Sequence, residues 1–394
     1  MGNPIQARSS SFHLLLFSIA LASDPSCPLE KHQFPYLRDD QKTALLQSKQ
    51  EFIRSDIILW EPETDYCLWE GVIWNVTTGY VIGLNLSSKL SKPIYDNSSL
   101  FGLNQLQLLN LAYNDFKFTP IPSGFDRLTY LTHLNLSNTC FSDQIPREFS
   151  NLTSLVSLDL SSDISCTPIL DSVVELRRPK LESPNLQGLI QDLTSLIELY
   201  LDGVDLSSQG SDWSQVFPQA LPNLRALSLS RCRLSGPVHC SLSQLVFLSQ
   251  LRLDYNHLRI EAPKFLRKLQ LSRCKINGSI PSSLANLTQL TDLNLSTNAF
   301  TGSIPLSLAN LTQLSFLDLS FNSFTGSVPL FESISQLSRL EYLFLAANNF
   351  SGTVKLDMFG NLENLKILDL SNNQMSLEVG NSTSSALPNL KSCA

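Results

Sequence analysis

Leucines and other apolar residues recur at fixed intervals along most of this chain, separated by polar positions. Residues 290–310 read LTDLNLSTNAFTGSIPLSLAN, and the same pattern begins again at Leu314, 24 residues later. Leu293 and Leu295 lie two positions apart, so in a short strand they project from the same face. The polar residues beside them project from the opposite face. Each copy therefore predicts a short strand that buries leucines on one side and meets solvent on the other.

The remainder of each copy predicts a turn and a return to the core. Asn298 follows the strand, and its amide can donate to and accept from backbone groups of its own turn and of the next coil. Gly302 permits an unusual backbone conformation, and Pro305 favours extended structure in the residue before it. Leu308 and Leu311 lead back to the core. One copy cannot bury its own leucines, whereas stacked copies can.

The period and the pattern L-x-x-L-x-L-x-x-N are typical of leucine-rich repeats. We therefore predict an α/β solenoid, a right-handed superhelix with a parallel β-sheet on its concave face. About twelve coils are expected, each with a leucine at the centre of its strand: Leu84, Leu109, Leu134, Leu158, Leu199, Leu227, Leu251, Leu269, Leu293, Leu317, Leu343 and Leu368.

Two intervals between these leucines break the period. The 41 residues from Leu158 to Leu199 predict an inserted loop near 165–190, because the cost of closing a loop rises slowly with its length. That loop is either a plain surface excursion or a ligand contact. The 18 residues from Leu251 to Leu269 fall below the ~20 that a coil requires and predict either a pinched coil or a small deletion relative to a regular ancestor. No closing cap follows the last repeat, so we expect residues 81–394 to be repeats of a longer protein.

The first 80 residues do not follow the repeat. Residues 1–22 predict a secretory signal peptide, since Arg8 precedes an apolar run that ends in small residues. Residues 23–80 predict a helical N-terminal cap, in which Asp39 and Asp40 can start a helix and Trp60 belongs to an apolar plug over the first coil. No later stretch reaches the ~18 apolar residues of a membrane span. The chain as written is therefore expected to be secreted without an anchor.

Charge and cysteines narrow the class further. A net charge of -7 argues against nucleic acid as a partner. Secretion permits disulfides among the eight cysteines, and Cys27 with Cys67 is the most plausible bridge. Cys232 and Cys274 replace the turn asparagine of their repeats, which predicts buried free thiols.

Secretion also permits glycosylation at Asn-x-Ser/Thr sites. Three such asparagines, Asn85, Asn135 and Asn294, fall within predicted strands, where a glycan would crowd the exposed face. The expected glycosylation sites are Asn75, Asn97, Asn151, Asn277, Asn286, Asn310, Asn349 and Asn381.

These residues resemble the ectodomain of plant leucine-rich-repeat receptor-like proteins of the disease-resistance type, and most nearly the tomato Cf and Verticillium-wilt receptor group. Gly-Ser-Ile/Val-Pro at 278–281, 302–305 and 326–329 matches the plant-specific repeat. The resemblance implies a cell-surface receptor without a kinase domain, which senses a protein or peptide on its concave face and signals through a co-receptor kinase. The family's cap has a Cys-Cys pair and a third cysteine, where this chain has Tyr66-Cys67 and Trp74.

Catalysis finds no support in the sequence. The four histidines after residue 22, His32, His133, His239 and His257, show no metal-ligand spacing, and no nucleophile or phosphate-binding motif is present. We therefore expect no enzyme activity, no cofactor and no metal. His133 and Asp159 occupy outward strand positions on neighbouring coils and are interpreted as a solvated pair.

Outward strand positions align from coil to coil into a ladder that can bind a ligand. Arginine and aromatic residues, which often anchor interfaces, are frequent in it. Ordinary surface variation with stacking between neighbouring aromatics is the alternative. Glu198 and Phe321 also lie on the ladder, and the candidate ligand-binding residues are Tyr200, Asp202, Arg231, Arg252, Asp254, Tyr255, Lys268, Arg273, Phe316, Tyr342 and Phe344.

The sequence thus predicts a recognition module, part of a plant receptor-like protein in defence, present at the extracellular face of the plasma membrane in the family and secreted in this form. The alternative is a secreted leucine-rich inhibitor of a microbial cell-wall-degrading enzyme. In the plant inhibitors that this alternative resembles, a compact array of repeats is closed at both ends by cysteine caps. The absence of a closing cap here therefore favours the receptor.

Overall fold

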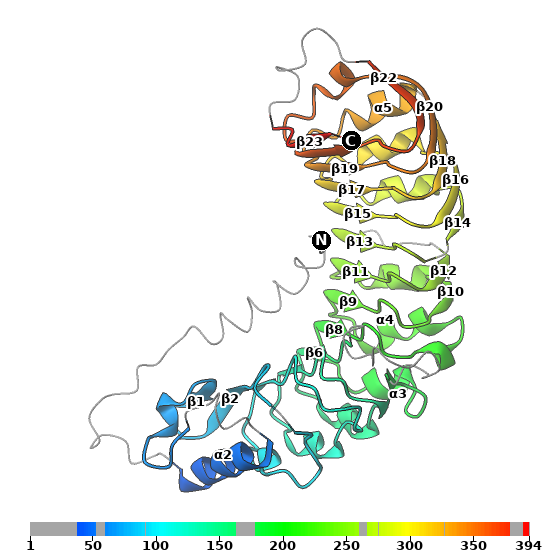
Figure 1. The fold of residues 1–394 in the computed structure, drawn as a ribbon. Helices are drawn as coiled ribbons and strands as arrows, with labels where there is room; N and C mark the ends of the chain where they lie inside the picture. Colours follow the sequence, from blue (N-terminus) through cyan, green and yellow to red (C-terminus); the bar gives the residue numbers. More distant parts are fainter. Residues whose placement is uncertain are drawn as a thin grey trace.

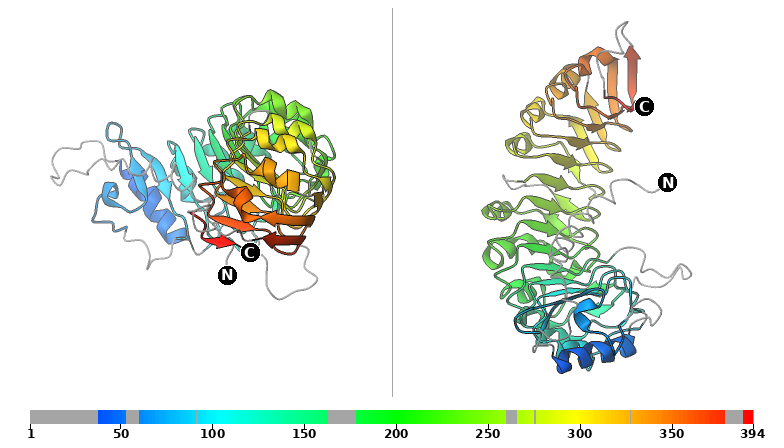
Figure 2. Two further views of the ribbon diagram at one scale, coloured as in Figure 1. Left: turned by 90° about the horizontal axis from the view of Figure 1, so that it is seen from above. Right: turned by 90° about the vertical axis from the view of Figure 1, so that its left-hand side faces the viewer.

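The computed structural model describes residues 38–52, 60–90, 92–162, 178–259, 266–274, 276–326, 328–378 and 389–393. The chain winds into a curved solenoid whose main sheet lines the inner side of the arc (Figure 1). The coils stack one on the next from the N-terminal helix to the last strand (Figure 2). The predicted solenoid with a concave parallel sheet is confirmed.

The main sheet has fourteen strands in chain order, and only the first pair is antiparallel. Its strands are β1 (Val72–Trp74), β2 (Val81–Asn85), β3 (Leu108–Asn110), β4 (His133–Asn135), β6 (Ser157–Asp159), β8 (Glu198–Tyr200), β9 (Ala226–Ser228), β11 (Gln250–Arg252), β13 (Lys268–Gln270), β15 (Asp292–Asn294), β17 (Phe316–Asp318), β19 (Tyr342–Phe344), β21 (Ile367–Asp369) and β23 (Ser392–Cys393).

The leucines predicted at the strand centres lie opposite one another along this sheet. Leu84 pairs with Leu109 at one end, and Leu343 pairs with Leu368 at the other. None of the twelve is more than 1% exposed. Leu251 lies opposite Leu269, so the short interval between them leaves the register unchanged. The convex part of that pinched coil lies outside the described residues.

A second set of strands runs along another edge of the coils (Figure 1). The Gly-Ser-Ile/Val-Pro steps fall in or beside them, which accounts for their recurrence. A five-stranded sheet contains β14 (Asn277–Gly278), β16 (Ala299–Ser303), β18 (Ser323–Gly326), β20 (Asn349–Lys355) and β22 (Gln374–Glu378). Two separate pairs join β5 (Asp143–Gln144) to β7 (Pro179–Lys180) and β10 (Ser235–Pro237) to β12 (His257–Arg259).

Short helices close most coils opposite the main sheet. The α-helices are α2 (Asp39–Phe52), α3 (Leu186–Ile190), α4 (Phe217–Ala220) and α5 (Val328–Ile334). The 3-10 helices are η1 (Tyr66–Leu68), η2 (Ser99–Gly102), η3 (Ser123–Arg127), η4 (Arg147–Asn151), η6 (Ser207–Gln209), η7 (Trp213–Gln215), η8 (Cys240–Gln244), η9 (Ser282–Asn286), η10 (Leu306–Asn310) and η11 (Leu356–Phe359).

Where a coil has a turn asparagine, that side chain ties the coil to the one before it. Asn298 Nδ2 donates to the carbonyl of Leu295 in its own turn at 3.0 Å and to that of Leu271 in the preceding coil at 2.8 Å. Its Oδ1 accepts from the N–H of Cys274 at 2.9 Å. The predicted bond within the turn is confirmed. The second partner is the preceding coil rather than the next, because Leu271 follows its strand and its carbonyl lacks a partner in the sheet.

Cysteine fills the same position in two coils. Cys232 and Cys274 are buried and free, as predicted. The Cys232 thiol lies 3.1 Å from the carbonyl of Leu201, and the Cys274 thiol lies 3.0 Å from that of Leu253. Each thiol therefore replaces the asparagine donor toward the preceding coil. Burial raises the pKa of both thiols, so they stay protonated as donors.

Aromatic residues close the N-terminal end, where α2 covers the first coil (Figure 1). Trp60 is fully buried and stacks on Trp69 with 5.4 Å between ring centroids. Tyr66 meets the ring of Trp74 edge-on at 6.5 Å. These two aromatics occupy cysteine positions of the resembled family and pack there instead. Cys67 is in a disulfide, while its predicted partner Cys27 lies outside the described residues.

Candidate ligand-binding face

Six basic side chains gather on the concave side of the three coils that contain β9, β11 and β13. We call this set the basic strip: Arg225, Arg231, Arg252, Arg267, Lys268 and Arg273. Arg252 lies 3.9 Å from the carboxylate of Asp254, which is itself buried. Among the described residues, Arg267, Lys268 and Arg273 have no carboxylate within ion-pair distance. The strip is therefore a local excess of positive charge on an acidic protein.

A tyrosine between two arginines orders this strip. The guanidinium carbons of Arg231 and Arg273 lie 4.4 and 5.3 Å from the ring centroid of Tyr255. The three residues come from successive coils and share a left-handed backbone, with φ of 59°, 53° and 59° for Arg231, Arg273 and Tyr255. Their side chains therefore leave the strands in the same direction. Cation–π contact of this kind holds long side chains in fixed positions at a small entropic cost.

Aromatic side chains continue the same face beyond the basic strip. We call Phe316, Phe321, Tyr342 and Phe344 the aromatic patch. The ring centroid of Phe316 lies 6.2 Å from that of Tyr342 and 5.8 Å from that of Phe344. Phe321 is 60% exposed. Stacking among neighbours, as the alternative interpretation expected, accounts for three of these rings but leaves the exposure of Phe321 unexplained.

The acidic candidates serve the fold rather than the surface. Asp202 Oδ1 accepts from the Ser228 hydroxyl at 2.6 Å and from the Ser230 N–H at 2.7 Å in the following coil. Asp254, only 6% exposed, accepts from the N–H of Ser272 at 2.8 Å. Both carboxylates complete hydrogen bonds between coils, and they are poorly placed for a ligand.

Tyr200 is half-buried on β8, beside the acidic side chain of Glu198. Burial, together with the nearby Glu198 carboxylate, raises the pKa of Tyr200, so its hydroxyl stays protonated and can donate a hydrogen bond. The Glu198 carboxylate accepts from the Ser157 hydroxyl at 3.0 Å. The face thus changes from acidic at β8 to basic at β9–β13 and to apolar at β17–β19.

The interpretation of His133 and Asp159 as a solvated pair is wrong. Asp159 is 7% exposed and accepts from the N–H of Ser161 at 2.9 Å, and burial raises the pKa of its carboxyl to about 6. His133 is half-buried, its ring nitrogen lies 2.9 Å from the Thr132 hydroxyl, and burial lowers its pKa. The Asp159 side chain folds back onto the backbone of the turn that follows its strand, so its carboxylate is shielded from water.

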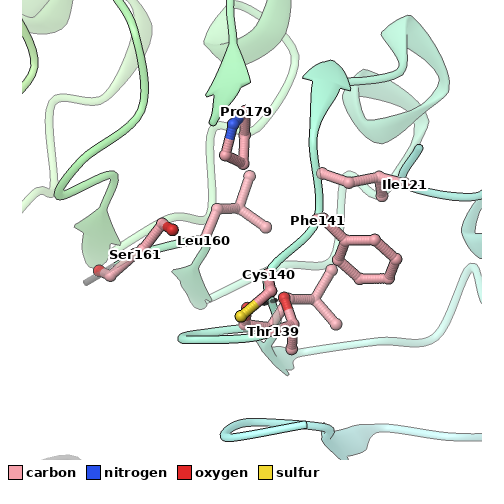
Figure 3. A pocket seen from close by; sticks show the side chains of 9 residues that line it. Ile121, Thr139, Cys140, Phe141, Leu160, Ser161 and Pro179 are labelled. Atoms are coloured by element: carbon pink, nitrogen blue, oxygen red, sulfur yellow. Dashed lines mark hydrogen bonds between the residues drawn. The ribbon is translucent and has the colours of Figure 1, made fainter. Parts of the chain in front are cut away.

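A pocket beside the insertion does not compete with this face as a ligand site. Its wall contains Ile121, Phe141, Leu160 and Pro179, with Cys140 and Ser161 at its rim (Figure 3). Its cavity volume of about 10 Å³ is far below the roughly 300–1,000 Å³ of small-molecule sites. Of the insertion predicted near 165–190, only residues 178–190 are described, and they contain β7, which pairs with β5, and α3.

Sequence reasoning missed two of the strip's arginines. Arg225 lies two residues before the central leucine of β9, and Arg267 lies two residues before that of β13. Both side chains are exposed, and neither residue is among the candidates predicted from the sequence. Their backbone N–H and carbonyl groups are hydrogen-bonded to adjacent coils, so only their side chains are available for other contacts. Because each stands just before the first residue of its strand, the alternation counted within the strand does not reach it.

The predicted glycosylation sites differ in exposure. Asn286 and Asn310 end η9 and η10 and are exposed, as are Asn97, Asn151, Asn277 and Asn349. Asn75 is half-buried, and Asn381 lies outside the described residues. Asn294 is 6% exposed, and its Oδ1 accepts from the N–H of Ser296 at 3.0 Å.

We therefore expect glycans on Asn286 and Asn310 of the protein secreted from plant cells, and none on Asn294. The reason is that an oligosaccharide on Asn294 would have to pass through packed concave side chains. Glycopeptide mass spectrometry measures the occupancy of all three sites in one digest. Occupancy of Asn294 comparable to that of Asn310 would contradict the burial argument.

Family models place the chain among leucine-rich-repeat proteins. The leucine rich repeat matches residues 265–324 in one model and 130–152, 223–245, 313–336 and 364–390 in another. The leucine rich repeat N-terminal domain matches residues 38–73. Receptor-like protein 6 of Arabidopsis thaliana is 36% identical over 248 residues, which cover 57% of this chain and 24% of that protein. The chain contains leucine-rich repeats and is similar to plant receptor-like proteins.

Other comparisons agree with this placement. The Cf-9 homolog of Solanum lycopersicum is 31% identical over 201 residues, which cover 50% of this chain and 21% of that protein. The chain thus spans less than a third of the length of these curated relatives. The ectodomain of the Arabidopsis receptor kinase HAESA, solved with a peptide hormone ligand, aligns with a TM-score of 0.63 at 26% identity and covers 85% of this chain and 57% of that one.

In the described part of the chain, no three histidine, cysteine or acidic side chains gather into a group that could hold a metal ion. Within the same residues, no helix is both long enough and apolar enough to span a membrane.

Proposed function

We propose that this leucine-rich-repeat protein recognises an extracellular peptide or protein on its concave face, as part of a plant receptor-like protein in defence signalling. The observation that carries the proposal is the gathering of the basic strip and the aromatic patch on one face of a rigid sheet. Arginine and aromatic side chains fixed in place are the groups that anchor interfaces. The relatives support the receptor class, and the HAESA ectodomain supports peptide recognition by this fold.

The finer parts of the proposal follow from the sequence. Residues 1–22 would direct the chain into the secretory pathway, residues 23–80 would cap the solenoid, and residues 81–394 would supply the repeats. The receptor would act at the extracellular face of the plasma membrane. A co-receptor kinase would transmit the signal, since the resembled family has no kinase domain of its own.

A capture experiment tests the proposal. Wild-type protein, a concave variant (Arg231→Ala, Tyr255→Ala, Arg273→Ala) and an opposite-side variant (Arg147→Ala, Ser282→Ala, Leu306→Ala) are immobilised, and apoplastic fluid from infected tissue is passed over each. The opposite-side residues lie in η4, η9 and η10 and are exposed. We expect the concave variant to lose a captured species that the other two retain.

Equal capture by all three proteins would remove the concave face as the recognition surface. The same preparations are assayed for inhibition of a fungal polygalacturonase. Inhibition by the wild type and by the concave variant alike would replace the receptor proposal with that of a secreted inhibitor.

A further inference from the structure

The left-handed turn position after each strand forms a row along the concave face. Its members from β9 to β17 are Arg231, Tyr255, Arg273, Thr297 and Phe321. Arginines occupy the first and third places with a tyrosine between them, a small polar residue occupies the fourth, and an exposed phenylalanine occupies the fifth. The row thus has two unlike contact points separated by a small residue that leaves room between them.

The first contact point suits an anionic group. Stacking on Tyr255 uses the face of a guanidinium, whereas a carboxylate binds its N–H edge, so the two interactions are compatible. Arg231 and Arg273 are already held by the ring, so little rotamer entropy is lost when a ligand binds. Lys268 and Arg267 are exposed on the coil that also contains Arg273 and add to the local potential.

The second contact point suits a large apolar group. Phe321 is 60% exposed, and the rings of Phe316, Tyr342 and Phe344 lie on the strands beside it. An apolar side chain placed there would bury ring surface that otherwise meets water.

The spacing of the two points sets the spacing of the ligand. From β11 to β17 there are three strand steps, through β13 and β15. At ~4.8 Å per step, Tyr255 and Phe321 are roughly 14 Å apart along the sheet. An extended peptide advances ~3.4 Å per residue, so about four residues cover that distance.

We propose that the concave face binds an extended peptide segment that has an acidic residue about four positions from a large apolar or aromatic residue. The acidic group lies between Arg231 and Arg273, and the apolar side chain lies on Phe321. This inference rests on the proposed function and names the chemistry of its ligand.

A peptide fits the face better than an acidic polysaccharide. A polyanion running along the sheet would leave the basic strip on one side toward Glu198 and Asp202, where carboxylates repel it. On the other side it would meet the aromatic patch, where Lys366 lies 5.8 Å from the ring centroid of Tyr342 and is paired with Glu341 at 2.6 Å. A segment with one acidic residue avoids both regions.

Selection from a displayed library of random 12-residue peptides tests the inference. The wild-type protein is the target, and the variants are Arg231→Gln with Arg273→Gln, Phe321→Ala, and Arg147→Gln as the control. Arg147 is an exposed arginine on η4, away from the face. Circular dichroism and thermal unfolding establish that each variant folds as the wild type does.

We expect the selected peptides to share an acidic residue and an aromatic or large aliphatic residue three to five positions apart. Their affinity should fall at least tenfold for the double arginine variant and severalfold for Phe321→Ala, with no change for Arg147→Gln. Peptides without acidic residues, or equal affinity for all variants, would overturn the inference. So would arginine-dependent binding of an oligogalacturonate with no acidic–apolar peptide selected.

The two proposals fail in distinguishable ways. If capture from apoplastic fluid depends on the concave face while the library yields no such peptides, the ligand chemistry is wrong and the recognition function stands. If capture does not depend on the concave face, the recognition surface itself lies elsewhere.

Discussion

Replacing Asn256 with alanine should lower the free energy of unfolding by about 3–5 kcal/mol, because several buried backbone groups lose their partner together. Asn256 is 1% exposed. Its Nδ2 donates to the carbonyls of Leu229 at 2.7 Å and Leu253 at 2.9 Å. Its Oδ1 accepts from the N–H groups of Cys232 at 3.1 Å and Leu234 at 2.9 Å. Urea denaturation followed by circular dichroism measures the loss.

Two further variants sharpen that experiment. Asn364 also bridges two coils, since its amide donates to the carbonyl of Ser338 at 3.0 Å, but it is exposed to water. Asn364→Ala should therefore cost less than about 0.5 kcal/mol. Asn256→Cys should lower the free energy of unfolding by an amount between those of Asn256→Ala and Asn364→Ala, because the thiols of Cys232 and Cys274 already serve as donors at this position. Equal stability of Asn256→Ala and Asn364→Ala would contradict the role given to the turn asparagine.

Asp159→Asn should stabilise the protein at pH 7 by up to about 3 kcal/mol and have little effect near pH 4. Burial raises the pKa of Asp159 from 3.8 to about 6 in the folded state. The folded state thus disfavours the ionised carboxylate, and the cost grows as pH rises from about 4 to 6 and is constant above that. A difference of roughly two pKa units corresponds to about 3 kcal/mol. Thermal unfolding across this pH range measures it.

Other coils supply the reason to expect asparagine to fit. Asn110, Asn135 and Asn294 occupy the equivalent place, and each accepts from the N–H two residues on at 2.9–3.0 Å, as Asp159 does. Asp369→Asn is the control, because Asp369 makes the same bond to Ser371 at 3.0 Å but is half-buried. A pH-independent effect of Asp159→Asn, or an equal effect of the two substitutions, would contradict the burial argument.

The leucine spacing was enough to predict the strands and their register. Leu158 and Leu199 were assigned to adjacent strands across 41 residues, and they are paired in the sheet. The reason is physical: each strand can bury its leucines only against the same position of its neighbours, so residues added between two strands do not change their pairing. The same constraint applies across the short interval before Leu269, since Leu251 and Leu269 are also paired in the sheet.

The sequence could not tell which outward positions stay exposed. Asp254 and Tyr255 are adjacent in the chain, yet Asp254 is 6% exposed and Tyr255 is 40% exposed. The difference depends on Ser272 in the following coil, which hydrogen-bonds to Asp254, and on the arginines that flank Tyr255. Contacts between coils therefore decide the face, and they depend on residues 18 to 28 positions apart.

Hydrogen–deuterium exchange tests the concave recognition face most directly. The protein is compared with and without the species captured from apoplastic fluid, and exchange is followed at the turns after β9, β11, β13 and β17. Slower exchange at those turns, with η9 and η10 unchanged, is the result expected. Protection confined to η9, η10 or the second sheet would place the ligand on another side of the solenoid and contradict the account.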